Sequence, residues 1–594
     1  MPTSSEHDPQ PSCILDGPGT TYRAGRGQTL RAKSWRAEAL LRMFENVLEV
    51  GEDPDNLIVY ASLGKAARNW EQAHSIATAL LEMGESQTLV LQSGAAIGLL
   101  PTGVSAPMVV SAVNNTVGRW SSAERFYERA AAGQTMWGGL TAGAWQYIGR
   151  QGVLQGTYEL LRTVAQVDFG AQPGHEAATM ASRWLLTSGM GGMGSSQPIS
   201  AKMLGLSSLT IEADVVKVQR MFDAHLIDKF ATDLPDALAG IEERTGDNGS
   251  KGPIAVGLVG NAAEVYRAIA ERGITPDIVT DQTAAHDARF GYLPLGYTLE
   301  QWRQRQENDP VRVERDARAS MAAQVGAMLT MADSGAVVFE NGNNLRIQAI
   351  EHLGASHADQ VGRISGFMEK YLRPLFAQGI GPFRWVCVSG DTADQDTMDS
   401  LASSLFPDRP EVANGIALAR KHVPQQGLPA RSCWIGHGER SQLAVAANAL
   451  VADGTLHGPV LFSRDHLDSA GMANPLIGNE GMIDGSDGVS DFPLLDGLLV
   501  AATGADLVAI HSGGGGYSGW MQSAGVSIVA DGEPGTALRL RTCLDADSGL
   551  GVMRHATAGY PEALQTIQSH GESTAAPFPW FHEVPHNSDG EQQQ

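Results

Sequence analysis

Apolar residues follow two patterns along this chain, one typical of helices and one typical of strands. Residues 34–51, SWRAEALLRMFENVLEVG, repeat apolar positions at intervals of three and four, which is typical of a helix with one buried face. Short apolar runs predict strands at residues 57–60, 88–91, 184–187, 209–211, 254–259 and 277–280. Residues 261–272 predict a helix between the last two strands, with Gly273 as its C-cap. Strands that alternate with helices favour a parallel sheet, so we expect an α/β fold.

Three glycines follow the strand predicted at 184–187. Gly189, Gly191 and Gly194 have G-x-G-x-x-G spacing, and the strand at 209–211 ends in Glu212. In a dinucleotide-binding βαβ unit, such glycines let the backbone approach a pyrophosphate at a helix N-terminus, and an acid about 20 residues on receives a ribose hydroxyl. The same spacing also occurs in tight turns that bind nothing. The position of Glu212 favours the nucleotide interpretation.

Polar residues also follow the next two predicted strands. Gly260 and Asn261 come directly after the strand at 254–259, and residues 281–287, DQTAAHD, come after the strand at 277–280. Ligands of parallel sheets gather at the carboxyl ends of strands, so both segments should reach the crevice beside the glycines. A lone histidine such as His286 is more often a structural hydrogen-bonding group, but its place at a strand end favours a functional role.

Composition excludes several classes of protein. The chain has 42 Lys and Arg against 66 Asp and Glu, a formal charge of -24, which disfavours binding to nucleic acid or to anionic membranes. Its four cysteines form no C-x-x-C pair, so neither a disulfide framework nor a metal centre is predicted. No apolar run is long enough to cross a bilayer, and the first residues lack a signal-peptide pattern. We expect a soluble cytoplasmic protein of two or three domains.

Many independent motifs resemble one enzyme family. They are ASLGKAARNW, QGTYE, GMGGMGSSQP, VGLVGNAAEV, PDIVTDQTAAHDARFGYLPLGYTLEQW, IGPFRWVCVSGD, GLPARSCWIGHGER, RDHLDS, DGSDGVSDFPLL and GVMRHATAGY. Together, from about Tyr22 to about Leu564, they resemble the urocanases (urocanate hydratases). Members of that family are cytoplasmic homodimers that add water to the conjugated imidazole-acrylate of urocanate. They use tightly bound NAD+ as an electrophile with no net redox change.

The resemblance also implies a domain plan. A Rossmann-type NAD-binding domain at 140–362 is inserted between an N-terminal core part at 22–139 and a C-terminal core part at 363–575. Residues 1–21 and 576–594 have too little apolar content to offset the entropy of ordering, so we expect disordered tails there.

By the same resemblance, a set of backbone and side-chain groups from all three parts contacts NAD+. These are Tyr60, Ala61, Gly192, Met193, Gly194, Glu212, Lys217, Asn261, Ala262, Gln282, Thr283, Ala284, Ala285, His286, Tyr292, Leu293, Asn341 and Gly515. Tyr60 is also expected to act in catalysis.

Substrate chemistry is expected from the C-terminal part. Cys433 matches the family's active-site cysteine, although the residue pattern alone predicts a buried apolar thiol. Arg384 is our first choice for gripping the substrate carboxylate with two parallel hydrogen bonds, with Arg373 as the competing candidate and a structural ion pair as the alternative. Asp468, slightly ahead of Asp465, is expected to transfer a proton or to orient an imidazole N–H.

Several positions depart from the urocanase pattern beside the expected pocket. Gly139 replaces a glutamine that contacts NAD+, Lys217 replaces an arginine and Asn341 a tyrosine, while Ala61 replaces a glycine. Polar groups are lost, and Trp137, Trp520 and Met521 add polarizable apolar surface. We therefore expect a ring-substituted substrate such as S-methyl thiourocanate or N-methylurocanate. Neutral drift in an ordinary urocanase of histidine degradation, an NAD+-binding sensor or scaffold without activity, and a true dehydrogenase remain as alternatives.

Overall fold

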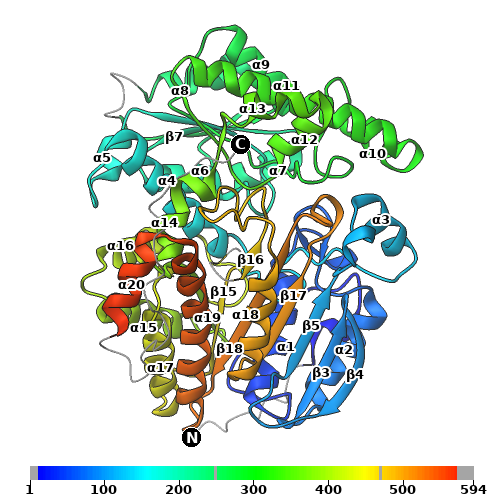
Figure 1. The fold of residues 1–594 in the computed structure, drawn as a ribbon, viewed down its shortest axis with the longest axis vertical. Helices are drawn as coiled ribbons and strands as arrows, with labels where there is room; N and C mark the ends of the chain where they lie inside the picture. The colour runs from blue at the N-terminus through cyan, green and yellow to red at the C-terminus, as the bar shows by residue number, and fades with distance from the viewer. Residues whose placement is uncertain (1–10, 246–250, 467, 469–470, 572–594) are drawn as a thin grey trace, which may run out of the picture.

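The structure of this chain is a computed structural model that describes residues 11–245, 251–466, 468 and 471–571. Two sheets organise it, one in the upper part of Figure 1 and one in the lower part. The upper sheet comes from the middle of the chain. The lower sheet combines strands from the two ends.

The upper sheet has seven strands, all parallel, in the order β12-β11-β10-β6-β7-β9-β8. Its strands are β6 (Trp184–Ser188), β7 (Ser207–Glu212), β8 (Lys229–Ala231), β9 (Ala255–Val259), β10 (Ile278–Val279), β11 (Val337–Glu340) and β12 (Ser365–Gly366). The order reverses around β6, as in a doubly wound Rossmann-like fold. Both faces of this sheet are covered, which is why every residue of β6 is buried and its sequence is mainly apolar.

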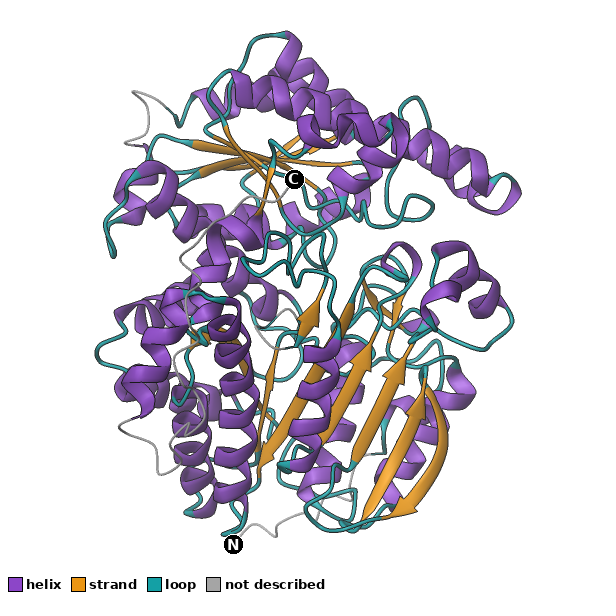
Figure 2. Cartoon of the chain, viewed as in Figure 1, coloured by secondary structure: helices purple, strands orange, loops and turns teal. Residues whose placement is uncertain are grey.

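Helices cover both faces of the upper sheet (Figure 2). The helices of this part of the chain are α5 (Glu176–Met180), α6 (Ser196–Met203), α7 (Val215–Asp223), α8 (Leu234–Glu242), α9 (Ala262–Glu271), α10 (Leu299–Asn308), which projects beyond the sheet, α11 (Pro310–Asp333), α12 (Leu345–Leu353) and α13 (Ala358–Val361). Asn261 caps α9 by accepting a hydrogen bond from the Glu264 amide, and Gly273, with φ of 67°, lies just beyond its end.

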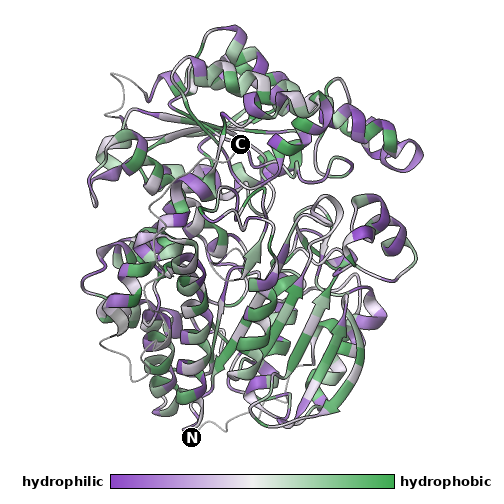
Figure 3. Ribbon diagram, in the orientation of Figure 1, coloured by the Kyte–Doolittle hydropathy of each residue, from purple (hydrophilic) through white to green (hydrophobic). Residues whose placement is uncertain are grey.

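The lower sheet has nine strands and joins the two ends of the chain. They are β3 (Gln87–Gln92), β4 (Ala95–Pro101), β5 (Val109–Val113), β13 (Gly381–Cys387), β14 (Ala430–Ile435), β15 (Val460–Arg464), β16 (Met472–Ala473), β17 (Leu507–His511) and β18 (Gln522–Ala530). Strand β5 pairs in parallel with β17, Val109 opposite Leu507, so the core joins segments that lie on the two sides of the upper domain in the sequence. Figure 3 shows how hydrophobic these strands are compared with the outer helix α10.

The remaining elements surround the lower sheet and connect the two parts. The helices are α1 (Trp35–Glu49), α2 (Trp70–Glu82), α3 (Ala123–Ala131), α4 (Arg150–Phe169), α14 (Arg373–Ala377), α15 (Thr392–Leu405), α16 (Pro410–His422), α17 (Glu439–Ala452), α18 (Asp491–Ala502), α19 (Thr536–Ala558) and α20 (Pro561–Gly571). Two short antiparallel strands, β1 (Ile58–Tyr60) and β2 (Gly64–Lys65), precede α2.

The predicted α/β fold with an inserted Rossmann-type domain is confirmed, and each predicted strand and helix occurs within a few residues of its expected bounds. The structure corrects the expectation of a disordered tail at residues 1–21. Residues Cys13–Asp16 form a short 3-10 helix whose Cys13 and Ile14 side chains are buried in the N-terminal core cluster. Burial of those two side chains offsets the entropy that this segment loses when it becomes ordered. Residues 1–10 of the tail expected at 1–21, and the whole tail expected at 576–594, lie outside the described residues.

Among the described residues, no helix combines the length and the apolar character needed to cross a membrane.

Candidate active site

A cavity of about 540 Å³ lies between the upper domain and the lower core, in the size range of small-molecule sites. All three parts of the chain line it: Tyr60 and Trp137 from the N-terminal part, Glu212 from the upper domain, and Arg384 and Asp465 from the C-terminal part. Its upper wall consists of the segments that follow β6, β7, β9 and β10. This is the carboxyl edge at which parallel sheets bind ligands.

The glycine turn after β6 has the geometry expected of a nucleotide-binding loop. Gly189 has φ of 90°, and a Cβ there would lie 2.5 Å from the Gln282 carbonyl oxygen. A Cβ on Gly194 would overlap the carbonyl oxygen of Gly189. The Glu212 carboxylate accepts hydrogen bonds from the amides of Met190, at 2.7 Å, and Asp214, at 2.9 Å. The acid therefore lies against the turn, as in dinucleotide-binding units.

Most residues expected to contact the cofactor line this cavity. They are Tyr60, Ala61, Gly192, Met193, Gly194, Glu212, Lys217, Ala262, Gln282, Thr283, Ala284, His286, Tyr292, Leu293 and Asn341.

Three residues of that set lie behind the wall. Asn261 donates to the Leu293 carbonyl oxygen at 2.9 Å, Ala285 is buried in the upper domain, and Gly515 packs so closely on Trp137 that a Cβ would lie 2.5 Å from its ring. These three shape the wall without lining it.

His286 lies in an aromatic setting. Its ring stacks on Tyr517 with centroids 4.5 Å apart and meets the edge of Trp137 at 5.8 Å. Its Nε2 has no hydrogen-bond partner among the described residues, and burial lowers the pKa of the imidazole to about 3. His286 is therefore neutral at physiological pH and offers one ring nitrogen to a ligand as a donor or acceptor, but no charge.

Arg384 and Asp465 form an ion pair in the wall contributed by the C-terminal part. One Arg384 nitrogen, Nη2, bonds the Asp465 carboxylate. The other two, Nε and Nη1, are buried and have no partner among the described residues. Every parallel pair of donors on a guanidinium includes Nη2, which has two N–H groups, one beside Nε and one beside Nη1. Arg384 can therefore present one such pair to a ligand carboxylate while Asp465 holds the other N–H of Nη2. The arrangement can thus hold an anionic ligand while Asp465 faces the same cavity.

The competing candidates lie elsewhere. Asp468 bonds Arg440 behind the cavity wall, and Arg373 donates to the Tyr560 hydroxyl at 2.9 Å and the Glu480 carbonyl oxygen at 2.5 Å. Neither lines the cavity. The geometry thus favours Asp465 over Asp468 and Arg384 over Arg373. The two residues of the RDHLDS motif are separated because Asp468 lies one turn beyond the end of β15.

Two more expectations differ from the structure. Trp137 and Met521 line the cavity, but Trp520 does not. Cys433 faces the apolar cluster on the other side of the lower sheet with Phe383, its partner on β13. Successive side chains of a strand point to opposite faces, and Trp434 is the residue of β14 that lines the cavity. Burial also raises the pKa of the Cys433 thiol. The Cys433 thiol therefore does not line the cavity.

Sequence reasoning missed several residues of the wall. Tyr147 stacks on Tyr60 with centroids 4.7 Å apart, and Glu52 accepts a hydrogen bond from the Gly192 amide at 2.6 Å. Tyr60 lies 2.7 Å from the Thr141 hydroxyl, and burial raises the pKa of its phenol to about 12. Neither Tyr147 nor Glu52 lies in a glycine motif or in a pattern typical of acid-base catalysis. The signal that could have found them is the dense aromatic content around residues 137–147.

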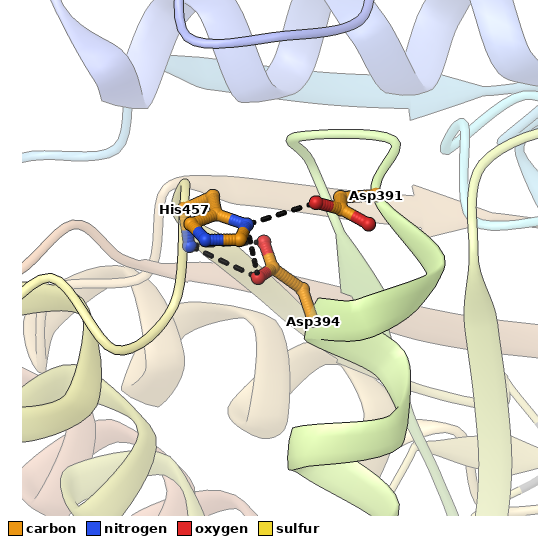
Figure 4. Close-up of side chains that lie close together, drawn as sticks. All are labelled: Asp391, Asp394 and His457. Atoms are coloured by element: carbon orange, nitrogen blue, oxygen red, sulfur yellow. Dashed lines mark hydrogen bonds and ion pairs between the residues drawn. The ribbon is translucent and has the colours of Figure 1, made fainter.

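A second cluster of ionisable groups lies on the lower core (Figure 4). Asp391, Asp394 and His457 bring their ligand atoms within 4.8 Å of one another. His457 Nδ1 lies 2.9 Å from Asp391, Asp391 caps α15 at the Ala393 amide, and Asp394 accepts from the His457 amide at 3.0 Å. These hydrogen bonds account for the three side chains without an ion, and we assign no metal to them.

Three family models match the chain in succession. They describe the urocanase N-terminal domain, matched by residues 22–146, the urocanase Rossmann-like domain, matched by residues 149–371, and the urocanase C-terminal domain, matched by residues 374–569. The matched ranges cover nearly all described residues, including every residue that lines the cavity except Tyr147 and Leu372.

Proposed function

The chain belongs to the urocanase family, whose members are hydro-lyases of the urocanate hydratase type, and we propose that it hydrates a ring-substituted urocanate with NAD+ as its cofactor. S-methyl thiourocanate and N-methylurocanate are the substrates that we expect. The observation that carries this proposal is one cavity in which the unpaired donors of Arg384 face an apolar wall and a dinucleotide-type glycine turn.

The residues around the glycine turn fit NAD+. Gly189 and Gly194 leave no room for side chains, and Glu212 stands at the end of the neighbouring strand. When bound, NAD+ supplies an electrophilic nicotinamide that draws electron density from the imidazole ring of the substrate. His286 and Trp137 form a neutral, aromatic part of the cavity wall, which would exclude water from that side of a bound ligand.

The C-terminal wall orients the substrate. Arg384 binds the carboxylate through its unpaired Nε or Nη1 together with one N–H of Nη2, and Asp465 holds the other N–H of Nη2 in place. Asp465 also faces the cavity, where its carboxylate accepts a ring N–H or the proton that water releases as it adds to the conjugated system. Tyr60 remains a neutral phenol at physiological pH and can donate a hydrogen bond.

An apolar wall supports the ring substituent. Phe376 stacks on Trp434 with centroids 5.5 Å apart and an angle of 6°, and both pack in one cluster with the thioether of Met521. All three line the cavity. A methylthio or N-methyl group gains dispersion contacts and loses little solvation there, whereas an unsubstituted ring would leave part of this surface without a partner.

We also propose that the enzyme is a cytoplasmic homodimer, as expected from the family. Sedimentation should then give twice the 62.9 kDa mass of the chain.

The test follows the ultraviolet band of the conjugated acrylate. Purified protein with NAD+ is given urocanate, S-methyl thiourocanate and N-methylurocanate in parallel, and kcat/KM is measured for each. We expect a preference of roughly fourfold or more for a substituted compound, because each buried methyl group contributes about 0.8 kcal/mol.

Equal or faster turnover of urocanate would assign the chain to ordinary histidine degradation. Bound NAD+ without turnover of any compound would favour a sensor or scaffold. Growth of absorbance from reduced nicotinamide would indicate a dehydrogenase.

A further inference from the structure

Three side chains of the cavity wall carry buried donors that no described atom accepts. They are Arg384 with Nε and Nη1, Trp434 with Nε1, and Asn474 with Nδ2. Asn474 is only 1% exposed. An unmade hydrogen bond at a buried donor costs stability, so such groups in an enzyme cavity point to a ligand that accepts.

The amide of Asn474 is held in one orientation. Its Oδ1 accepts from the Leu476 amide at 3.0 Å, and its own backbone amide donates to Asn479 Oδ1 at 2.6 Å. Its carbonyl oxygen accepts from the Gly478 amide at 2.9 Å and the Asn479 amide at 2.8 Å. Because Oδ1 is committed to a backbone N–H, Nδ2 is the atom left for the cavity.

The surroundings of Asn474 are apolar. Met472 precedes it on β16, Ile477 follows it in the turn, and both belong to the cluster that contains Trp434 and Met521. In this low-dielectric setting a hydrogen bond to a charged acceptor is stronger than in water. The unpaired donors of this wall therefore suit an anion.

We propose that Asn474 is a substrate-binding residue that donates Nδ2 to the carboxylate gripped by Arg384, and that it selects acids over neutral analogues. This inference rests on the proposed function. A carboxylate offers about four acceptor positions, so the two donors of Arg384 leave positions for Asn474 and for the Trp434 indole. An amide or ester would present a donor or a bulky group at one of them.

The experiment compares two isosteric changes in the same turn. Asn474→Asp replaces the donor by a charged acceptor, whereas Asn479→Asp keeps the Oδ1 that supports the turn and does not touch the cavity. Calorimetry with saturating NAD+ measures Kd for 3-(imidazol-4-yl)propanoate and for its carboxamide, which lack the double bond and are not hydrated. Asn474→Ala serves as a second variant that adds no charge.

We expect Asn474→Asp to weaken propanoate binding about 30-fold or more and Asn474→Ala about tenfold, with less than a threefold change for the carboxamide. Asn479→Asp should bind both compounds like the wild type. The inference would be overturned if the Asn474 variants lost equal affinity for both compounds or kept the wild-type Kd. It would also be overturned if Asn479→Asp lost as much affinity for the propanoate as the Asn474 variants. If the wild type binds the propanoate but hydrates no urocanate, the proposed function fails and the comparison still decides the role of Asn474. A wild type that does not bind the propanoate contradicts both.

Discussion

The cavity depends on side chains whose chemistry is set by their immediate partners. Arg384 illustrates this, because one of its nitrogens is fixed by Asp465 while two remain available. The sequence alone left open whether this arginine forms a structural ion pair or binds substrate. In the structure Nη2 forms the ion pair with Asp465, and that contact orients the donors that the proposed substrate binding needs.

Arg384→Lys is expected to raise KM for the carboxylate substrate about 10- to 100-fold. Lysine keeps the charge but cannot form two parallel hydrogen bonds, a loss of about 1.5–3 kcal/mol. Steady-state kinetics with the preferred substrate measures the change. Arg431→Lys is the matched control, because Arg431 is a buried arginine of the same sheet paired with Asp399 away from the cavity. An equal rise of KM in both variants would contradict the role of Arg384.

Acid should destabilise the protein through its buried neutral histidine. The pKa of His286 is about 3 in the folded chain and 6.5 in the unfolded one, so between these values the unfolded chain binds an extra proton. Stability therefore falls as pH drops below 6.5. His286→Gln should remove about 1.5 kcal/mol of the loss between pH 6.5 and about 5. Denaturant titrations at both pH values measure this, and identical pH dependence in the variant would show that His286 does not contribute.

Among the elements, the turn between β6 and α6 is the one on which the proposed binding of NAD+ depends. Its glycines are required by close backbone approach, since Gly189 lies against the Gln282 carbonyl oxygen that follows β10. The opposite wall consists of side chains from β13 and β14. Because successive side chains of a strand point to opposite faces, Arg384 and Trp434 line the cavity while Cys433 packs in the core.

Gly194→Ala should weaken NAD+ binding at least about 100-fold, because the new Cβ would overlap the Gly189 carbonyl oxygen and force the turn open. Calorimetric titration with NAD+ measures the effect. Gly326→Ala in α11 provides the control: its Cβ meets open space, and helix propensity predicts a gain of up to about 1 kcal/mol in stability. Normal NAD+ affinity in a folded Gly194→Ala protein would show that the turn is not the cofactor site.

At the scale of the whole molecule, the cavity exists only where the inserted domain meets the core. Contacts across this boundary include Arg346 with Glu480 at 2.7 Å, and the Tyr517 hydroxyl with the Gly342 carbonyl oxygen at 3.2 Å. Because residues of all three parts line the cavity, a ligand that fills it bridges the two parts and stabilises both.

NAD+ at 100 times its Kd should stabilise the folded chain by about 2.7 kcal/mol. In scanning calorimetry every resolved transition should move to higher temperature, because the bound cofactor contacts both the upper domain and the core. Adenosine monophosphate, which lacks the nicotinamide half, is the control and should shift the transitions less. A shift confined to one transition would place the cofactor within a single domain.

The sequence by itself determined the local structure and half of the site. Hydrophobic periodicity predicted the strands and helices, and the glycine spacing with Glu212 predicted the close turn after β6, because both signals act through neighbouring residues on one segment. Only the tertiary structure chose Asp465 over Asp468, turned Cys433 to the core, and brought Asn474 and Tyr147 to the cavity. These outcomes depend on which face of a strand meets a partner that is distant in the sequence, as Phe383 is from Cys433 and Arg384 from Asp465, and no local pattern encodes that pairing.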